Sequence, residues 1–565
     1  MHLRADRIDV RAAVVDAIEV EWSLSDDRLT WSLANRSDVP VAVDAVAVVT
    51  RLDPVLEPLR MLRQGYQSWS PTAVATFRVD QDGSRAEGVR SLPIGMHHAD
   101  WAPSEVDELR SELVTALRDD AGAVVVAGFL GGWEHDGTFR LRPARDGGGG
   151  IELWIEAFLG GAVLAPGERR ELHEVTIAVG QGDPASLLEA WAGALGSAAE
   201  ARTTAPYQVG WCSWYHYFHG VTEADLRSNL ALANRWPFDV FQLDDGFQAA
   251  IGDWLDTNDK FPTPIDGLAA AIAAEGRTPG IWIAPFLAGA TSEVAVAHPD
   301  WLATHLPTGR PLVGMVNDGW GGAVNTLDTS NPEVLEHLEG VARALVEAGY
   351  PYIKLDFTFA PSMLGGYVDR SRTPAQRVRA GFDAVRRGAG EDTFLLGCGA
   401  PLGSTVGVVD GMRIGADVAP WWHPQPDQYR PPGHLGGEPA TVNAWRNTLS
   451  RSFMHRRLWL NDPDCLMLRA ERTKLEPEQM RAWALAVGVS GGMALVSDDL
   501  ALLGPDARSL LDEVVALGRE ADAGAHPPRC LDLMEVDPPT RLATATVELV
   551  GDPDDGMAYV QGLLA

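Results

Sequence analysis

The sequence predicts a multidomain protein of α/β and β class, in which a central (β/α)8 TIM barrel follows an N-terminal β-sandwich and precedes a small C-terminal β domain. Three observations support this prediction. The chain has 565 residues, which is more than one hydrophobic core ordinarily holds. Roughly its first 195 residues contain short strand-like runs separated by turns. The part that follows alternates strand and helix patterns eight times, which is typical of a closed barrel.

The N-terminal region, residues 1–196, has strand-like runs at 29–34, 41–49, 123–128 and 151–157. Short strands at this spacing predict two packed β-sheets. A helix pattern at 184–195 leads into the small-residue stretch 196–206, which we interpret as a linker.

The barrel is predicted over residues 207–522. The expected strands are 208–214, 240–245, 280–285, 352–357, 394–399, 411–417, 458–464 and 493–499. The expected helices are 223–236, 265–276, 332–349, 374–388, 440–455 and 476–488, with 506–519 after the last strand. Residues 523–565 predict a small β domain.

Polar and aromatic residues stand where these strands end. In a barrel of this kind the active site lies at the carboxyl ends of the strands, so these side chains should meet at one mouth. The strand ends carry Trp214, Asp244, Asp245, Trp282, Asp356, Cys398, Asp417 and Asp464.

The run 352–357 ends in Asp356, two residues after Lys354, so a strand places both side chains on one face. A cation beside a carboxylate keeps it ionised, which suits a nucleophile. A buried structural ion pair is the alternative reading. The run 411–417 likewise puts Arg413 and Asp417 on one face. Two carboxylates at strand ends match what glycosidic bond cleavage requires.

The adjacent acids Asp244 and Asp245 allow two interpretations. They could bind a divalent cation, but Lys354 and Arg413 would share the same mouth and disfavour one. We therefore expect no metal and interpret both acids as acceptors for sugar hydroxyls. No phosphate-binding or dinucleotide-binding glycine motif occurs, so no cofactor is expected.

Aromatic residues near the strand ends could form the walls of a sugar pocket. Trp282, Trp214 and Tyr215 are the candidates, although core packing explains any one of them equally well.

The composition excludes several partners. A formal net charge of −32 argues against nucleic acid and anionic lipid. No apolar run approaches a membrane-spanning length, and the first residues lack the apolar core of a signal peptide. We expect a cytoplasmic protein with no membrane contact, acting on a neutral small molecule.

Several motifs resemble those of the α-galactosidases of glycoside hydrolase family 36, particularly the compact bacterial members of clan D. These motifs are GWCSWYHYF, FQLDDGF, GIWIAPF, YIKLDF, LGCGAPL, GMRIGADVAPWW and LWLNDPDCL, and they cover about residues 207–500 in order. The N-terminal segment GYQSW at 65–69 also resembles the family's segment that reaches over the barrel mouth.

The resemblance implies that Asp356 is the nucleophile and Asp417 the general acid/base. It implies that Asp244 and Asp245 bind the galactose O4 and O6 region, with Trp282 and Trp69 as walls. The other expected substrate-binding residues are Lys354, Arg413, Cys398, Trp214 and Tyr215.

The implied activity is that of a retaining exo-α-galactosidase that hydrolyses terminal α-galactosyl residues of small oligosaccharides by double displacement. α-N-Acetylgalactosaminidase and transgalactosylase activities on the same fold are alternatives. A non-catalytic galactoside-binding protein is an alternative of another class. The sequence leaves the oligomeric state, the natural linkage and the preferred chain length open.

Overall fold

The central sheet is a nearly closed barrel of eight parallel strands. The computed structural model describes residues 1–79, 108–144, 150–425, 437–524 and 527–563. The strands are β14 (Gln208–Cys212), β15 (Val240–Leu243), β18 (Thr278–Ile283), β22 (Tyr352–Leu355), β23 (Phe394–Gly397), β24 (Gly411–Arg413), β25 (Leu460–Asp462) and β26 (Met493–Val496). Their order is β25-β24-β23-β22-β18-β15-β14-β26. A parallel bridge between Leu466 and Val496 links the chain after β25 to β26. The predicted barrel is confirmed.

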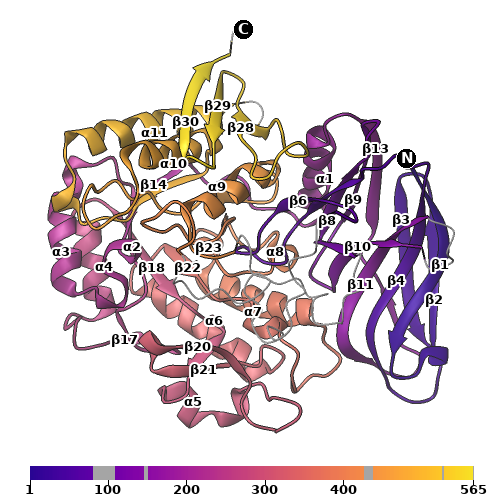
Figure 1. The fold of residues 1–565 in the computed structure, drawn as a ribbon. Coiled ribbons are helices and arrows are strands. Elements are labelled where there is room, and N and C mark those ends of the chain that lie inside the picture. The colour runs from indigo at the N-terminus through magenta and orange to yellow at the C-terminus, as the bar shows by residue number, and fades with distance from the viewer. Residues whose placement is uncertain (80–107, 145–149, 426–436, 525–526, 564–565) are drawn as a thin grey trace.

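Helices lie around the outside of this barrel (Figure 1). They are α3 (Glu223–Leu232), α4 (Ile265–Ala274), α6 (Pro332–Glu347), α7 (Pro374–Ala389), α9 (Thr441–Ser450), α10 (Pro477–Ser490) and α11 (Pro505–Ala523). Local sequence fixes several of their starts. Thr222 and Thr373 each form a capping box before α3 and α7, and Asn331 caps α6.

Two antiparallel sheets form the N-terminal region. One has the order β1 (His2–Ala12), β4 (Val41–Asp53), β11 (Ile151–Leu164), β10 (Asp136–Pro143) and β7 (Leu109–Glu112). The other has the order β12 (Arg169–Glu171), β3 (Arg28–Asn35), β13 (Val175–Gln181), β9 (Ala123–Phe129), β8 (Val114–Arg118), β5 (Arg60–Arg63) and β6 (Ala73–Thr76), with β2 (Ile18–Leu24) paired to β3. The rings of Phe129 on β9 and Phe139 on β10 lie 5.1 Å apart, so the two sheets share a core.

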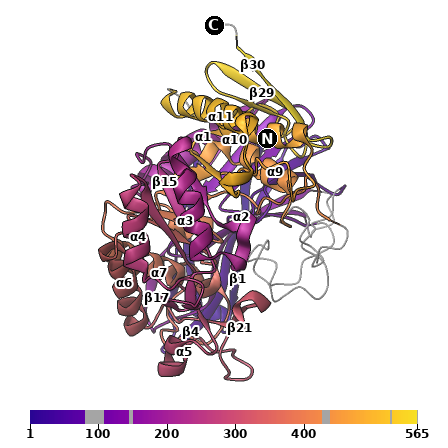
Figure 2. The same ribbon diagram turned by 90° about the vertical axis from the view of Figure 1, so that its left-hand side faces the viewer.

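Helix α1 (Ala185–Ala198) leads from these sheets to the barrel, and a fourth sheet follows α11. This last sheet contains β27 (Arg529–Cys530), β28 (Arg541–Ala543), β29 (Val547–Asp552) and β30 (Met557–Gly562), all antiparallel. Figure 2 shows β29 and β30 beside α10 and α11. Trp445 of α9 packs there and donates to the Pro539 carbonyl. The domain boundaries predicted at 196, 207 and 522 stay predictions.

Two small antiparallel insertions interrupt the barrel pattern, and their strands lie outside the strands predicted from the sequence. The first pairs β16 (Gln248–Ala250) with β17 (Asp253–Thr257). The second joins β19 (Leu287–Gly289), β20 (Val313–Asn317) and β21 (Gly322–Thr326), with the short helix α5 (Glu293–Ala297) between β19 and β20. The β20–β21 hairpin carries Trp320, which lies at the barrel mouth.

The predicted strand 411–417 is too long. Strand β24 ends at Arg413, because the Ile414 N–H makes the last bond to β25 at Asp462 and the chain then turns. Gly415 lies against Ala444 of α9, where a Cβ would meet the Ala444 Cα at 3.4 Å. Asp417 is therefore held by a turn beyond the strand end.

No helix among the described residues has both the length and the apolar character that crossing a bilayer requires.

Gly407 marks a tight contact between the barrel and the end of α1. Its φ is +86°, and a Cβ there would lie 2.1 Å from the Ala199 carbonyl oxygen. Gly167 has a similar φ of +74° but has no atom within 4 Å of its Cβ position. We expect Gly407→Ala to lower the free energy of unfolding by roughly 1–3 kcal/mol more than Gly167→Ala, because only Gly407 adds a steric clash to the backbone cost. Chemical denaturation of the two variants measures this difference, and equal losses would contradict the contact.

Candidate active site

A cavity of about 260 Å³ opens at the carboxyl ends of the barrel strands. It brings together every predicted site residue except Cys398 and Arg413. The described residues that line it are Trp69, Trp214, Tyr215, Asp244, Asp245, Trp282, Asn317, Trp320, Lys354, Asp356, Phe357, Asp417, Gly437 and Pro439. We call it the mouth pocket.

Lys354 lies at the base of the mouth pocket between two carboxylates. Its Nζ is 3.0 Å from Asp244 Oδ2 and 3.7 Å from Asp356 Oδ2, and all three side chains are buried. Burial alone would lower the pKa of Lys354, but the charges of Asp244 and Asp356 outweigh it and raise the pKa well above its ordinary value. Lys354 is thus a fixed positive charge that compensates both acids.

The Asp356 carboxylate is held in one orientation by donors on both oxygens. The indole N–H of Trp282 donates to Oδ2 at 3.0 Å, and the Phe357 backbone N–H donates to Oδ1 at 2.8 Å. Phe357 has a φ of +51°, a left-handed conformation that is rare for a bulky side chain. Such conformations cluster at functional sites, and this one turns the Phe357 N–H back onto Asp356.

Asp417 lies above a second buried cation, Arg413. The Arg413 guanidinium contacts Asp417 at 3.1 Å, Asp462 at 3.2 Å and Asp464 at 2.7 Å. Desolvation raises the pKa of Asp417; the nearby Arg413 opposes this rise, and the charge of Asp356 adds to it. The Asp417 side chain keeps 35% of its surface accessible because it faces the pocket.

Asp464, behind Asp417, shares the same network. Burial, opposed by Arg413 and reinforced by Asp417 and Asp462, raises the pKa of Asp464 to about 7. Its side chain accepts from the Tyr215 hydroxyl and from the Val418 N–H. Three carboxylates around one guanidinium favour keeping a proton within this group near neutral pH.

Asp244 and Asp245 differ in their surroundings although they are adjacent. The Asp244 backbone N–H donates to the Ser213 hydroxyl at 2.9 Å, and Asp244 Oδ2 accepts from Lys354 Nζ at 3.0 Å. Asp245 Oδ2 accepts from the indole N–H of Trp320 at 2.7 Å and lies 3.1 Å from His219 Nδ1.

Aromatic rings enclose the pocket from the N-terminal sheets as well as from the barrel. Trp69 packs edge-on against Phe357 at 5.0 Å, and its buried indole N–H has no hydrogen-bond partner among the described residues. The segment that carries it is fixed by Arg451, which donates to the carbonyls of Ser68 and Ser70. The expected reach of residues 65–69 to the barrel mouth agrees with this position.

Two predicted site residues lie behind the pocket wall. Arg413 is buried and reaches the cavity through Asp417, while the buried Cys398 lies close enough to Asp356 and Arg413 for their charges to act on it. Burial raises the pKa of the Cys398 thiol well above its ordinary value, so it stays protonated.

Sequence reasoning missed Trp320, Asn317, Phe357, Gly437 and Pro439. Trp320 and Asn317 belong to the inserted hairpin, whose Asn317-Asp-Gly-Trp320 turn was the available signal. Among the described residues, no group of three or more His, Cys, Asp or Glu side chains is arranged to hold a metal ion.

The sequence and the fold of this chain are similar to those of known α-galactosidases. The melibiase family model matches residues 210–365. The α-galactosidase AgaA of Geobacillus stearothermophilus is 27% identical over 184 residues, which are 31% of this chain and 24% of that protein. The α-galactosidase TtGalA of Thermus thermophilus, solved with p-nitrophenyl α-D-galactopyranoside, has a TM-score of 0.69 and 26% identity over 93% of this chain and 98% of that one.

This chain is similar to α-galactosidases, including members of glycoside hydrolase family 36. The resemblance predicted from its motifs is confirmed, and the crystal structure of the family 36 enzyme AgaA shares its fold, with a TM-score of 0.64 and 14% identity over 97% of this chain and 78% of that one. The aligned segment spans only about a quarter of the curated relative AgaA, whereas nearly the whole of TtGalA is matched.

Lys354 offers a direct test of the charge balance in the mouth pocket. We expect Lys354→Met to lower the free energy of unfolding by about 3–5 kcal/mol at pH 7, because Asp244 and Asp356 lose their buried counter-charge.

The matched control is Lys474→Met, at an exposed lysine that bonds Gln425. It should change stability by no more than about 0.5 kcal/mol. Denaturant titrations of both variants at pH 7 provide the measurement, and equal losses in Lys354→Met and Lys474→Met would contradict the assignment.

Proposed function

We propose that this chain is a retaining exo-α-galactosidase that releases terminal non-reducing α-D-galactose from small α-galactosides. The observation that carries the proposal is that Asp356 and Asp417, from the ends of β22 and β24, line one pocket in different electrostatic surroundings. Asp356 lies beside Lys354, while the pKa of Asp417 is raised by desolvation. This is the division between nucleophile and acid that glycoside hydrolysis uses.

The proposed reaction follows from the different surroundings of Asp356 and Asp417. The Asp356 carboxylate attacks the anomeric carbon while Asp417 gives its proton to the departing glycosidic oxygen, so that the C–O bond breaks and a galactosyl ester forms. Asp417, now a carboxylate, takes a proton from water, and the resulting hydroxide attacks the same carbon and releases Asp356. Two displacements restore the original configuration.

The size of the pocket supports the exo mode. Its volume of about 260 Å³ is below the ~300–1,000 Å³ usual for drug-sized ligands, so it fits one sugar ring better than a chain. We propose that Asp244 and Asp245 accept from the O4 and O6 hydroxyls and that Trp282 and Trp69 form the walls. A sugar hydroxyl could accept from the free Trp69 N–H. The related TtGalA was solved with stachyose, an α-galactoside.

Trp320 has a positioning role in this proposal. Its N–H holds Asp245 Oδ2, and its ring lies 4.9 Å from Phe357 and 6.0 Å from Trp282. The inserted hairpin therefore fixes one of the two acids that select the sugar.

Asp356→Ala tests the nucleophile. We expect kcat on p-nitrophenyl α-galactoside to fall by more than about 10³-fold, because no ester can form. Azide should restore part of the activity and give a β-galactosyl azide, since a single displacement inverts the configuration. Asp512→Ala, a surface carboxylate on α11, is the matched control and should keep full activity. Wild-type rates in Asp356→Ala would overturn the proposal. Wild-type protein that binds saccharide without hydrolysing it would also overturn the proposal and would indicate a non-catalytic galactoside-binding protein.

Tyr215→Phe tests the acid. The Tyr215 hydroxyl lowers the pKa of Asp417, so its removal should raise that pKa further and keep Asp417 protonated to higher pH. We therefore expect the alkaline limb of the kcat/KM profile to move to higher pH in Tyr215→Phe. Tyr207→Phe, at a partly buried tyrosine outside the mouth pocket, should leave the profile unchanged. A profile that does not move, or that moves to lower pH, would contradict the role of Asp417.

Parallel assays separate the related activities. Hydrolysis of the 2-acetamido substrate would indicate an α-N-acetylgalactosaminidase, and product analysis would reveal transgalactosylation. The cytoplasmic location and the absence of a metal requirement stay predictions, and activity in the presence of a chelator tests the second.

A further inference from the structure

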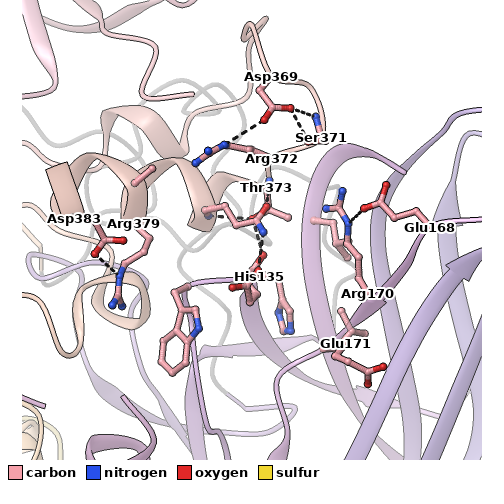
Figure 3. A pocket seen from close by; sticks show the side chains of 16 residues that line it. His135, Glu168, Arg170, Glu171, Asp369, Ser371, Arg372, Thr373, Arg379 and Asp383 are labelled. Carbon is pink, nitrogen blue, oxygen red and sulfur yellow. Dashed lines mark hydrogen bonds and ion pairs between the residues drawn. The ribbon is translucent and has the colours of Figure 1, made fainter. Parts of the chain in front are cut away.

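A second and larger cavity lies where the N-terminal sheets meet the barrel, outside the mouth pocket (Figure 3). Its volume is about 710 Å³, within the ~300–1,000 Å³ range of ligand pockets. We call it the junction cavity. The described residues that line it are Trp133, Glu134, His135, Leu159, Glu168, Arg170, Glu171, Leu172, Asp369, Ser371, Arg372, Thr373, Gln376, Arg379, Ala380 and Asp383.

Direct hydrogen bonds between the two parts of the chain hold the walls of the junction cavity. The Thr373 hydroxyl and the Gln376 amide, at the start of α7, donate to the carbonyl and the side chain of Glu134, each at 2.7 Å. The Val163 N–H on β11 donates to the Arg370 carbonyl at 2.9 Å. The cavity is therefore a preformed space at a junction of structural units, a frequent location of binding sites.

The charges on its walls are largely compensated. Arg170 pairs with Glu168 at 2.7 Å. On the opposite wall, the Arg379–Asp383 pair is 2.8 Å long and the Arg372–Asp369 pair 3.3 Å (Figure 3).

Two further lining carboxylates, Glu134 and Glu171, give five acids against three guanidiniums among the described lining residues. Burial lowers the pKa of His135, so this residue is neutral at pH 7. A slight negative excess disfavours an anion, while three guanidiniums in the walls disfavour a cation. The remaining class is a neutral ligand rich in hydroxyl groups.

Several of these groups keep hydrogen-bonding capacity for such a ligand. Among the described residues, Arg372 bonds Asp369 through Nε alone, which leaves its two terminal nitrogens available. Asp383 accepts from Arg379 through Oδ1 alone, which leaves Oδ2 available. The two terminal nitrogens of Arg372 can donate to adjacent hydroxyls of a sugar ring, and Asp383 Oδ2 can accept from one hydroxyl.

Trp133 adds an apolar surface to these polar groups. Its ring is partly exposed at the cavity wall, with the His173 ring edge-on at 4.7 Å and the Arg379 guanidinium 5.7 Å from its centre. These neighbours hold the ring in place, and an aromatic face beside paired charges matches the mixed C–H and O–H surface of a pyranose.

We propose that the junction cavity is a second, non-catalytic binding site for a neutral oligosaccharide. The inference goes beyond the proposed function, because binding at Trp133 does not depend on turnover at Asp356. The junction cavity should bind sugars in general, since none of the groups in its walls selects galactose.

The test is calorimetric titration of Asp356→Ala protein with two trisaccharides. We expect raffinose, an α-galactoside, to bind at two sites, and maltotriose, which has no galactose, to bind at the junction cavity alone. Adding Trp133→Ala should weaken maltotriose binding at least about 10-fold and leave one raffinose site. Arg372→Ala should weaken maltotriose binding as well, and its partly exposed side chain makes misfolding no concern.

Trp22→Ala is the matched control, since Trp22 is a 37% exposed tryptophan on β2 that does not line the cavity. It should leave both affinities unchanged. The proposal is overturned if maltotriose does not bind in solution, if it binds only at the concentrations of a crystal soak, or if neither Trp133→Ala nor Arg372→Ala weakens it. If Trp133→Ala does not fold, the Arg372→Ala result decides.

Discussion

The mouth of this barrel depends on two buried cations that compensate a larger number of carboxylates. Lys354 lies between Asp244 and Asp356, and Arg413 contacts Asp417, Asp462 and Asp464. Buried charges are tolerated only when they are paired, so each cation fixes the positions of the acids around it. The acids outnumber the cations, and burial raises the pKa values of Asp417 and Asp464, which favours a retained proton on the Arg413 side.

The unequal pairing of cations and carboxylates gives Asp356 and Asp417 different properties, although both are aspartates. Asp356 has a lysine at its side and accepts two N–H groups, both of which favour a carboxylate. Asp417 shares Arg413 with two other carboxylates, which leaves it the better proton donor. The chemistry that we propose needs this difference, and the barrel supplies it from strands β22 and β24, which lie on either side of β23.

Much of the fold could be predicted because each barrel strand is a buried apolar run that ends in a polar or aromatic residue. Asp244, Asp356 and Trp282 were found in this way. The exact strand ends could not be predicted, since the turn after Arg413 depends on packing of Gly415 against α9. The backbone conformation of Phe357 was equally hidden, because nothing in its residue type favours a positive φ.

The other differences between the predicted and the observed site involve the inserted hairpin and the N-terminal segment. Trp320 follows no barrel strand, so strand-end reasoning had no access to it, although its N–H contacts Asp245. Trp69 was identified by motif resemblance, and only the structure connects its position to Arg451. Cys398 was expected at the sugar but lies behind the wall, because strand-end position alone does not tell which side chains reach the cavity.

The account most directly predicts where a covalent intermediate forms. A fluorinated α-galactosyl fluoride, which slows breakdown of the ester, should label the protein once, and mass spectrometry of the digested protein should find the sugar on the peptide that contains Asp356. A sugar on a different residue, or continued hydrolysis with no covalent adduct, would contradict it.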